Sequence, residues 1–159
     1  MNGKPASLFW DGPSFASALP TRGSLLGLDV SPRRLGIAGT DAGRSLVTPL
    51  RTWPRRRLDA DLAEIAAFAA AREAVGLIVG WPLSMDGRRG PACDRVRAFA
   101  GQLWRRLLLP ILLQDERLTT AAVEQAIVEG RYPVPRGEAA TDHLAAAVIL
   151  EDALRAMST

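Results

Sequence analysis

The segment over residues 25–40 constrains the fold most, because it places a carboxylate inside a short apolar run. It reads LLGLDV, then SPRR, then LGIAGT. Apolar runs of this length, bounded by Ser, Pro and Gly, are typical of two strands joined by a turn. Asp29 lies inside the first run, where a charged side chain is costly unless it is paired or bound to a cation. Asp29 is therefore either a strand-end residue that caps the turn or a metal ligand with partners elsewhere in the chain.

Size and composition narrow the class of protein. The 159 residues, 48% of them hydrophobic, suffice for one domain with a core. No apolar run approaches the roughly eighteen residues that span a bilayer, and the start lacks the pattern of a secretory signal. The single cysteine excludes an internal disulfide, and the single histidine leaves no Cys/His zinc site. We therefore expect a cytoplasmic protein that does not associate with membranes.

Arginine supplies almost all of the positive charge, because the chain has one lysine. Guanidinium groups bind phosphate bidentately, so clusters of arginine fit a nucleic-acid partner. A codon-usage bias towards Ala and Arg would produce the same clusters, so charge alone does not decide between the two explanations. The clusters are Arg33-Arg34, Arg55–Arg57, Arg88-Arg89 and Arg105-Arg106.

The order of apolar segments predicts an α/β fold with a mixed five-stranded sheet and helices on both faces. Residues 1–22 follow no period, so we expect a poorly ordered or surface-laid extension there, and a single domain over 23–159. The expected strands are 25–30, 35–40, 45–50, 77–80 and 111–114. The expected helices follow Asp59 or Asp61 as far as Gly76, run from about Pro91 to Leu108, follow Thr119 or Thr120 as far as Gly130, and follow Thr141.

Three acids on three elements can converge at one edge of this sheet. Asp29 lies on the first strand, Glu116 follows the last strand, and Asp142 lies in the first turn of the last helix, whose N-terminus favours an anion. Unpaired carboxylates in one place repel one another, and a divalent cation removes the conflict. Oxygen ligands suit Mg²⁺ or Mn²⁺, which can drive phosphodiester hydrolysis without His or Cys.

Four motifs together resemble one family. LLGLDVSPRRLGIAGTD, LIVGWPLSMDG, QDERLTT and DHLAAAVIL, in this order, are similar to the motifs of the YqgF (RuvX) family over about residues 24–154. That family is described as Holliday junction resolvases and as nucleases that mature the precursor of 16S ribosomal RNA. The resemblance implies a ribonuclease H-like fold of the RuvC superfamily, a divalent-metal site, and Asp29, Glu116 and Asp142 as the catalytic acids. Ser31, Arg33 and Thr141 depart from the glycine and lysines that the family often has there.

The sequence leaves more than one role open for residues next to the three acids. Since adjacent strand residues face opposite ways, only one of Asp115 and Glu116 enters the site, and the motif favours Glu116. Arg117 either binds phosphate or pins the neighbouring acids. Arg33 and Arg34 lie in the first turn, where we expect contact with the scissile strand.

Three functions follow as hypotheses. The first is a Mg²⁺- or Mn²⁺-dependent nuclease, acting on precursor 16S ribosomal RNA or, alternatively, on a branched DNA junction. The second is an actin-type phosphate-binding ATPase lobe, although such nucleotides lie between two lobes and this chain has one and lacks a P-loop. The third is a non-catalytic nucleic-acid-binding domain. The oligomeric state stays open, since a homodimer would suit a four-way junction and a monomer would suit RNA trimming.

Overall fold

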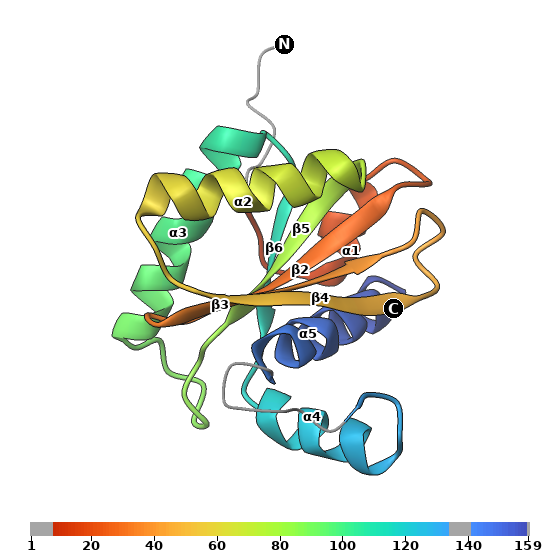
Figure 1. Cartoon of the computed structure of the whole chain (residues 1–159), viewed down its shortest axis with the longest axis vertical. Helices are drawn as coiled ribbons and strands as arrows, with labels where there is room; N and C mark the ends of the chain where they lie inside the picture. The colour runs from red at the N-terminus through yellow and green to blue at the C-terminus, as the bar shows by residue number, and fades with distance from the viewer. Residues whose placement is uncertain (1–7, 134–140, 159) are drawn as a thin grey trace.

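A mixed six-stranded sheet with helices on both faces forms the computed structural model, which describes residues 8–133 and 141–158 (Figure 1). The strands lie in the order β1-β6-β5-β2-β3-β4, with β1, β6, β5 and β2 parallel and β2, β3 and β4 antiparallel neighbours. The strands are β1 (Leu8–Phe9), β2 (Ser24–Val30), β3 (Arg34–Thr40), β4 (Val47–Pro54), β5 (Ala74–Trp81) and β6 (Ile111–Asp115). The helices are α1 (Gly12–Ser17), α2 (Leu58–Ala71), α3 (Pro91–Leu107), α4 (Thr119–Val128) and α5 (Asp142–Met157).

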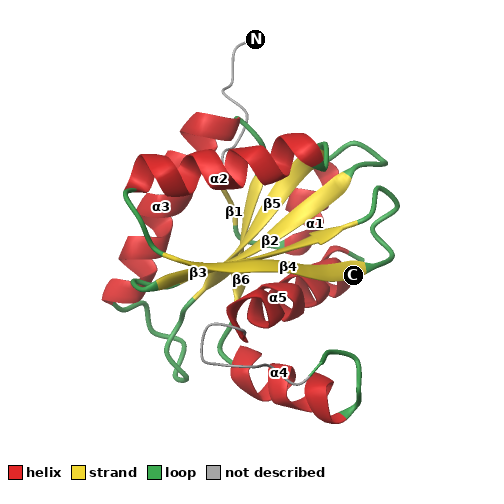
Figure 2. Ribbon diagram, viewed as in Figure 1, coloured by secondary structure: helices red, strands yellow, loops and turns green. Residues whose placement is uncertain are grey.

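The central strand β2 separates two hydrophobic cores. Successive side chains of a strand point to opposite faces. Accordingly, Leu26 and Leu28 pack in the core beneath α2 and α3, whereas Leu25 packs in the core beneath α5. Figure 2 shows α2 and α3 over one face of the sheet and α5 over the other, with α4 beyond α5. The mixed sheet covered on both faces is therefore confirmed, and β4, which contains Pro49 and Pro54, lies at the sheet edge.

Helix α5 lies unusually close to β2 and β3 because glycines face it. A Cβ at Gly27 would lie 2.8 Å from the carbonyl oxygen of Ala146, and one at Gly36 would lie 2.2 Å from the carbonyl carbon of Asp142. Real Cβ atoms do not approach that closely, so any side chain at these positions would push the helix away. The small side chains of Ala146 and Ala147, both fully buried, complete the close contact.

Residues 8–22 of the predicted extension are instead part of the sheet and the core. Leu8 and Phe9 pair with β6 as a sixth strand, where the sequence predicts five, and Phe15 of α1 is fully buried beside α5. Neither element is long enough to show a period, which is why the pattern escapes sequence analysis. Residues 1–7 fall outside the described residues, and a domain boundary at residue 23 remains a prediction.

Two smaller points concern the helices. No helix in the described part of the chain is long and apolar enough to cross a bilayer.

The predicted cap of α2 by Asp59 or Asp61 is not formed, since Arg57 occupies the cap position without a side-chain hydrogen bond. Asp61 is instead fully buried within the first turn, where it accepts hydrogen bonds from the β4–α2 loop.

We predict that Phe15→Ala destabilises the protein by about 3–5 kcal/mol, because it empties a fully buried site between α1 and α5. Urea unfolding of the full chain measures the loss. Ser14→Ala, an exposed change on the same helix, should stay within about 0.5 kcal/mol of wild type. Equal stability of the Phe15→Ala variant and wild type would show that α1 is not part of the core.

We also predict that Gly36→Ala costs about 1–3 kcal/mol, because the added Cβ overlaps the backbone of the first turn of α5. Gly101→Ala in α3 is the matched control, since its Cβ would meet nothing within 4 Å. That helical substitution should be neutral or stabilise by up to about 1 kcal/mol. Thermal unfolding compares the two, and a neutral Gly36→Ala would contradict the close approach of α5.

Candidate active site

The three predicted acids gather where the parallel strands end. Asp29 is the penultimate residue of β2, Glu116 directly follows β6, and Asp142 begins α5. Because β2, β5 and β6 are parallel, their carboxyl ends meet at the same edge of the sheet. Asp29 and Glu116 line one cavity of about 340 Å³, whose other walls come from the β2–β3 turn, the β4–α2 loop, the residue after β5, and α3.

The two carboxyl groups in the cavity are hard to ionise. Burial raises the pKa of Asp29 to about 6, and the nearby Asp142 carboxylate adds to the rise, while Arg34 opposes it. Burial also raises the pKa of Glu116 to about 8, with further contributions from the charges of Asp29 and Asp115. The mutual influence of these groups shows that acids far apart in the sequence are electrostatic neighbours in the fold.

Asp142 is held by arginine. The Nε of Arg34, on β3, donates to Oδ2 of Asp142 at 2.5 Å, and the Asp142 side chain is only 14% exposed. The same arginine lowers the pKa of Asp29, so one guanidinium offsets negative charge on both acids. Arg34 is also a predicted nucleic-acid-binding residue, and in the structure it pairs with one of the candidate catalytic acids.

The next residue anchors the start of α5 to β4. The backbone N–H of His143 donates to Oγ1 of Thr52 at 3.0 Å, and Nδ1 of the ring lies 2.7 Å from the same oxygen. Burial lowers the pKa of His143, although Asp142 opposes the shift. His143 therefore anchors the start of α5 through Thr52.

The predicted three-acid metal site is only partly assembled. Among residues 8–133 and 141–158, no three His, Cys, Asp or Glu side chains are grouped closely enough to hold a metal ion. The physical reason is that like charges repel and Arg34 offers Asp142 a hydrogen-bonded counter-charge. Asp29 and Glu116 nevertheless fit a hard divalent cation, because both present buried oxygen donors to one cavity and are costly to ionise without a counter-ion.

A glycine on the neighbouring strand makes room for Glu116. A Cβ at Gly80 of β5 would lie 2.2 Å from Oε2 of Glu116 and 2.8 Å from the side chain of Ile149 on α5. Any other residue at position 80 would displace the carboxylate. The glycine in the run LIVGW is thus a signal for the site that sequence analysis used only as part of a motif.

Asp115 and Arg117 pair with each other beside the site. Nε and Nη2 of Arg117 lie 2.9 and 2.7 Å from Oδ2 of Asp115. Although burial opposes it, hydrogen bonds from Arg117 and its charge lower the pKa of Asp115. Of the two explanations for Arg117, the structure thus shows an ion pair with a neighbouring acid, and Glu116, not Asp115, lines the cavity.

Two cations that line the cavity, Arg55 and Arg95, are not among the predicted site residues, and Arg55 stands out in the sequence only as a member of an arginine cluster. Arg55 is held firmly: its Nε donates to Oδ2 of buried Asp61 at 2.9 Å, its Nη1 donates to the carbonyl of Ser31 at 3.0 Å, and it lies 5.1 Å over the ring of Phe99. The signal was present in the run RRR followed by an aspartate in the next helix.

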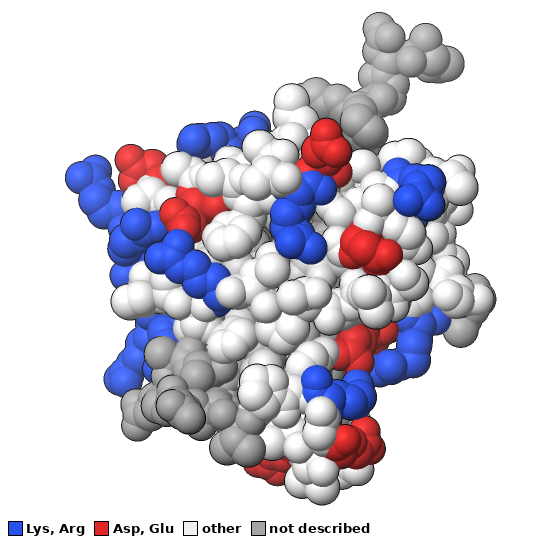
Figure 3. All heavy atoms as spheres, turned by 45° about the vertical axis from the view of Figure 1, so that its right-hand side comes forward, with Lys and Arg blue, Asp and Glu red and all other residues white. Residues whose placement is uncertain are grey.

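Other arginines differ in whether they are paired. Arg33 is exposed in the β2–β3 turn and has no carboxylate partner among the described residues. On the face in Figure 3, arginines gather mainly along one edge of the view with acids among them. Charge on that face is therefore mixed and does not form a continuous positive track.

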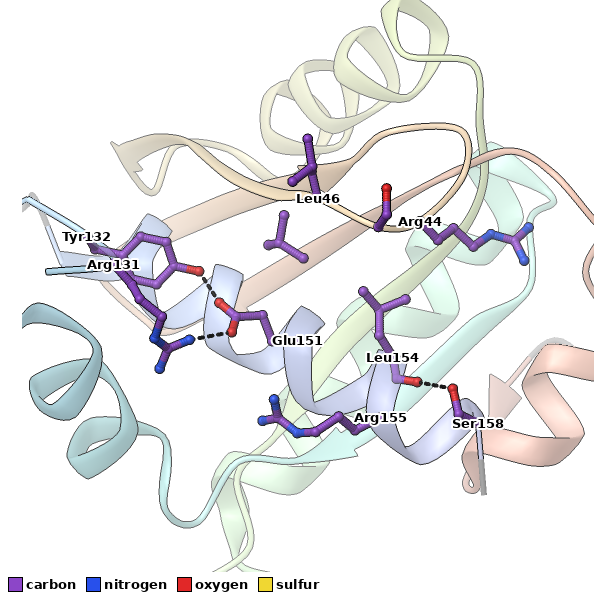
Figure 4. Close-up of a pocket in the computed structure, with 10 residues that line it drawn as sticks. Arg44, Leu46, Arg131, Tyr132, Glu151, Leu154, Arg155 and Ser158 are labelled. Atoms are coloured by element: carbon purple, nitrogen blue, oxygen red, sulfur yellow. Dashed lines mark hydrogen bonds and ion pairs between the residues drawn. The ribbon is translucent and has the colours of Figure 1, made fainter. Parts of the chain in front are cut away.

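A larger hollow of about 630 Å³ lies away from the acids, between the start of β4 and the last turns of α5 (Figure 4). Its central carboxylate, Glu151, accepts hydrogen bonds from Tyr132 and from Nη1 of Arg131. Arg44 donates to the carbonyls of Gly23 and Pro20. These groups already satisfy one another, so the smaller cavity with the two perturbed acids is the better candidate.

The topology and the acids at the strand ends define a RuvC-like, ribonuclease H-like fold. RuvC of Thermus thermophilus superimposes with a TM-score of 0.59 in its complex with a Holliday junction and 0.58 on its own. These alignments cover 86% of this chain and 97% of RuvC, at 13% and 14% identity, so they establish the fold alone.

Within that class, the chain belongs to the RuvX family, described as Holliday junction resolvase, whose model matches residues 23–156. It is 45% identical to a pre-16S rRNA nuclease of Sphingopyxis alaskensis, over 92% of this chain and 95% of that one. It is 44% identical to a protein of the same name from Rhodospirillum rubrum, over 91% and 90%. The family resemblance predicted from the motifs is confirmed, and the ATPase-lobe alternative is not favoured.

We predict that Glu116→Gln stabilises the metal-free protein progressively as the pH rises. The folded-state pKa of about 8 exceeds the ordinary value of 4.5, so the wild type loses stability as the pH rises between these values, and the amide does not. The variant should gain about 2–4 kcal/mol on wild type between pH 5 and pH 9. Urea unfolding of both proteins in the presence of a chelator, at several pH values, measures the difference in the free energy of unfolding.

Asp115→Asn is the matched control for this titration. The pKa of Asp115 is lowered, so removing its charge should decrease the stability at neutral pH, whereas Glu116→Gln should increase it. A Glu116→Gln variant whose stability runs parallel to wild type across this pH range would show that Glu116 is solvated and not in the cavity.

Proposed function

We propose that this chain is a divalent-metal-dependent nuclease that matures the 5′ end of precursor 16S ribosomal RNA. The observation that carries the proposal is the cavity shared by Asp29 and Glu116, two buried acids with raised pKa values, in a chain whose curated relatives are named pre-16S rRNA nucleases. A protein that only binds nucleic acid has no use for two acids that are costly to keep charged.

Asp29 and Glu116 would hold the cation, and Asp142 would join them if it left Arg34. Their carboxylate oxygens are the ligands that Mg²⁺ and Mn²⁺ prefer. A divalent cation held there would supply Lewis-acid stabilisation of the negative charge that builds up during phosphodiester hydrolysis. The ion would also offset the effects of burial and of mutual repulsion, which raise the pKa values of the two acids.

The cations of the cavity orient the phosphodiester. Arg55 and Arg95 line it together with the acids, and Arg55 is immobilised by Asp61 and Phe99. Guanidinium groups bind phosphate in a fixed geometry, and an arginine already held in place loses little entropy on binding. Arg33, exposed in the adjoining turn, is placed to contact the strand outside the cavity, whereas Arg117 acts through its pair with Asp115.

Resolution of branched DNA is the second candidate, favoured by the description of the matching family as Holliday junction resolvase. The acids and arginines would contact the backbone, which DNA and RNA share, so the site chemistry is the same. Resolution of a four-way junction requires two cuts and so a two-fold pair of sites, whereas RNA trimming requires one. We propose a cytoplasmic location for either activity.

We predict that Asp29→Asn, Glu116→Gln and Asp142→Asn each lower cleavage by more than about 100-fold in Mg²⁺ or Mn²⁺, since each removes a carboxylate that would ligate the ion. Asp115→Asn should stay within about threefold, because it breaks only a partly exposed pair. The substrates are a 16S rRNA fragment with its 5′ extension, a four-way DNA junction and a linear duplex.

The outcomes separate the candidates. Cleavage of the RNA at the mature 5′ end supports the proposal, and cleavage of the junction alone, by a species of twice the chain mass in solution, supports the alternative. No cleavage of any substrate, or equal cleavage by the wild type and the Asp29→Asn variant, would contradict a nuclease at this site.

A further inference from the structure

A cluster of two tryptophans and two arginines lies beside the catalytic cavity. Trp10, which follows β1, meets Trp81 edge to face with ring centroids 5.1 Å apart. The guanidinium of Arg89 lies 5.2 Å from the Trp10 ring and 5.7 Å from the Trp81 ring, and that of Arg97 lies 5.9 Å from the Trp10 ring. We call these four residues the Trp10 patch.

The two tryptophans differ in burial. Trp81 is 5% exposed and packs in the core, whereas Trp10 is 45% exposed. A tryptophan needed only for packing would be covered, as Trp53 is at 3%. Trp10 is nevertheless held in place, because it follows the strand β1 and contacts Trp81. A fixed, half-exposed indole is a surface on which a planar group can stack.

The arginines of the patch lack carboxylate partners. Within residues 8–133 and 141–158, neither Arg89 nor Arg97 forms an ion pair, whereas Arg88 pairs with Asp86 and Arg55 with Asp61. Both are exposed. Two uncompensated guanidinium groups over an aromatic ring fit a ligand that alternates phosphates with planar bases, and single-stranded nucleic acid has that chemistry.

The patch adjoins the cavity through two elements. Trp81 ends β5, and its carbonyl accepts a hydrogen bond of 3.2 Å from the backbone N–H of Glu116. Arg95, which lines the cavity, is two residues from Arg97 on α3, so the first turns of this helix separate the cavity from the patch. A strand whose phosphodiester enters the cavity can therefore place a neighbouring nucleotide at Trp10.

We propose that the Trp10 patch binds unpaired nucleotides that flank the scissile phosphodiester, with a base stacked on Trp10 or on the guanidinium planes beside it, and with Arg89 and Arg97 on the phosphates. The inference rests on the proposed function, because the nucleotides that bind the patch belong to the strand whose phosphodiester enters the cavity. Residues 8–22 thereby contribute to substrate binding from outside the region that matches the family model. The patch selects unpaired over paired nucleotides, because a base inside a duplex has both of its faces covered by its neighbours.

The test measures binding without cleavage. The full chain in chelator is titrated into fluorescein-labelled single-stranded RNA of mixed sequence and into a blunt duplex of equal length, at one salt concentration. Base stacking on an aromatic residue contributes about 1–3 kcal/mol, so Trp10→Leu should weaken binding of the single strand by roughly 5- to 100-fold. Binding of the duplex should change by less than about twofold.

Charge variants provide the matched control. Arg89→Gln and Arg97→Gln should each weaken single-strand binding at least about threefold more than Arg106→Gln does. Arg106 is an exposed arginine of the same helix without an ion pair among the described residues, so the loss of net charge is equal. Trp10→Phe keeps an aromatic face and should recover most of the affinity, which guards against a Trp10→Leu variant that misfolds.

The outcomes are distinct from those of the cleavage test. Equal single-strand affinity in wild type, Trp10→Leu and Arg89→Gln would overturn the Trp10 patch while leaving the acids and their nuclease activity intact. Weaker binding in these variants alone supports the patch, even if no substrate is cleaved. Equal losses for Arg97→Gln and Arg106→Gln, together with an unaffected Trp10→Leu, would reduce the effect to non-specific charge and also overturn it.

Discussion

The close packing of α5 against β2 and β3 is the constraint on which the rest of the structure depends. It requires glycine at positions 27 and 36, since a side chain at either would overlap the helix backbone. The packing brings the start of α5, with Asp142, over the end of β2, with Asp29. On the neighbouring strand, Gly80 leaves the space that Glu116 occupies. By their lack of side chains, the glycines thus allow α5 and Glu116 to lie close to the sheet.

Asp29 and Glu116 destabilise the fold when they are ionised, because both carboxyl groups are buried. Burial and mutual repulsion raise the pKa values of Asp29 and Glu116, and Arg34 offsets part of the negative charge by binding Asp142. This balance explains why the three acids are neighbours without forming a closed group of ligands. A site of this kind gains stability when a cation or a cationic group enters, which couples binding to the stability of the protein.

The cationic residues near the cavity divide into two groups with different roles. Arg34, Arg55 and Arg117 are each fixed on an aspartate, so they shape the site and its electrostatics, and Arg55 also lines the cavity, where we propose that it orients the phosphodiester. Arg33, Arg89 and Arg97 have no carboxylate partner within the described residues and are exposed, so their charge is open to a phosphate backbone. The arginine clusters in the sequence do not reveal this division, because it depends on which carboxylates the fold brings near.

The sequence by itself determined the class of fold and predicted the three candidate acids, because strand and helix periodicity and four ordered motifs are local properties of the chain. It also favoured Glu116 over Asp115 as the site residue, and in the structure Asp115 forms an ion pair with Arg117. Only the tertiary structure decided that residues 8–22 add β1 and α1 to the fold, that Asp142 pairs with Arg34, and that Arg55 and Arg95 line the cavity. Each of these is a contact between residues distant in the chain, and two-residue strands and single side-chain pairs leave no period in a sequence from which to predict them.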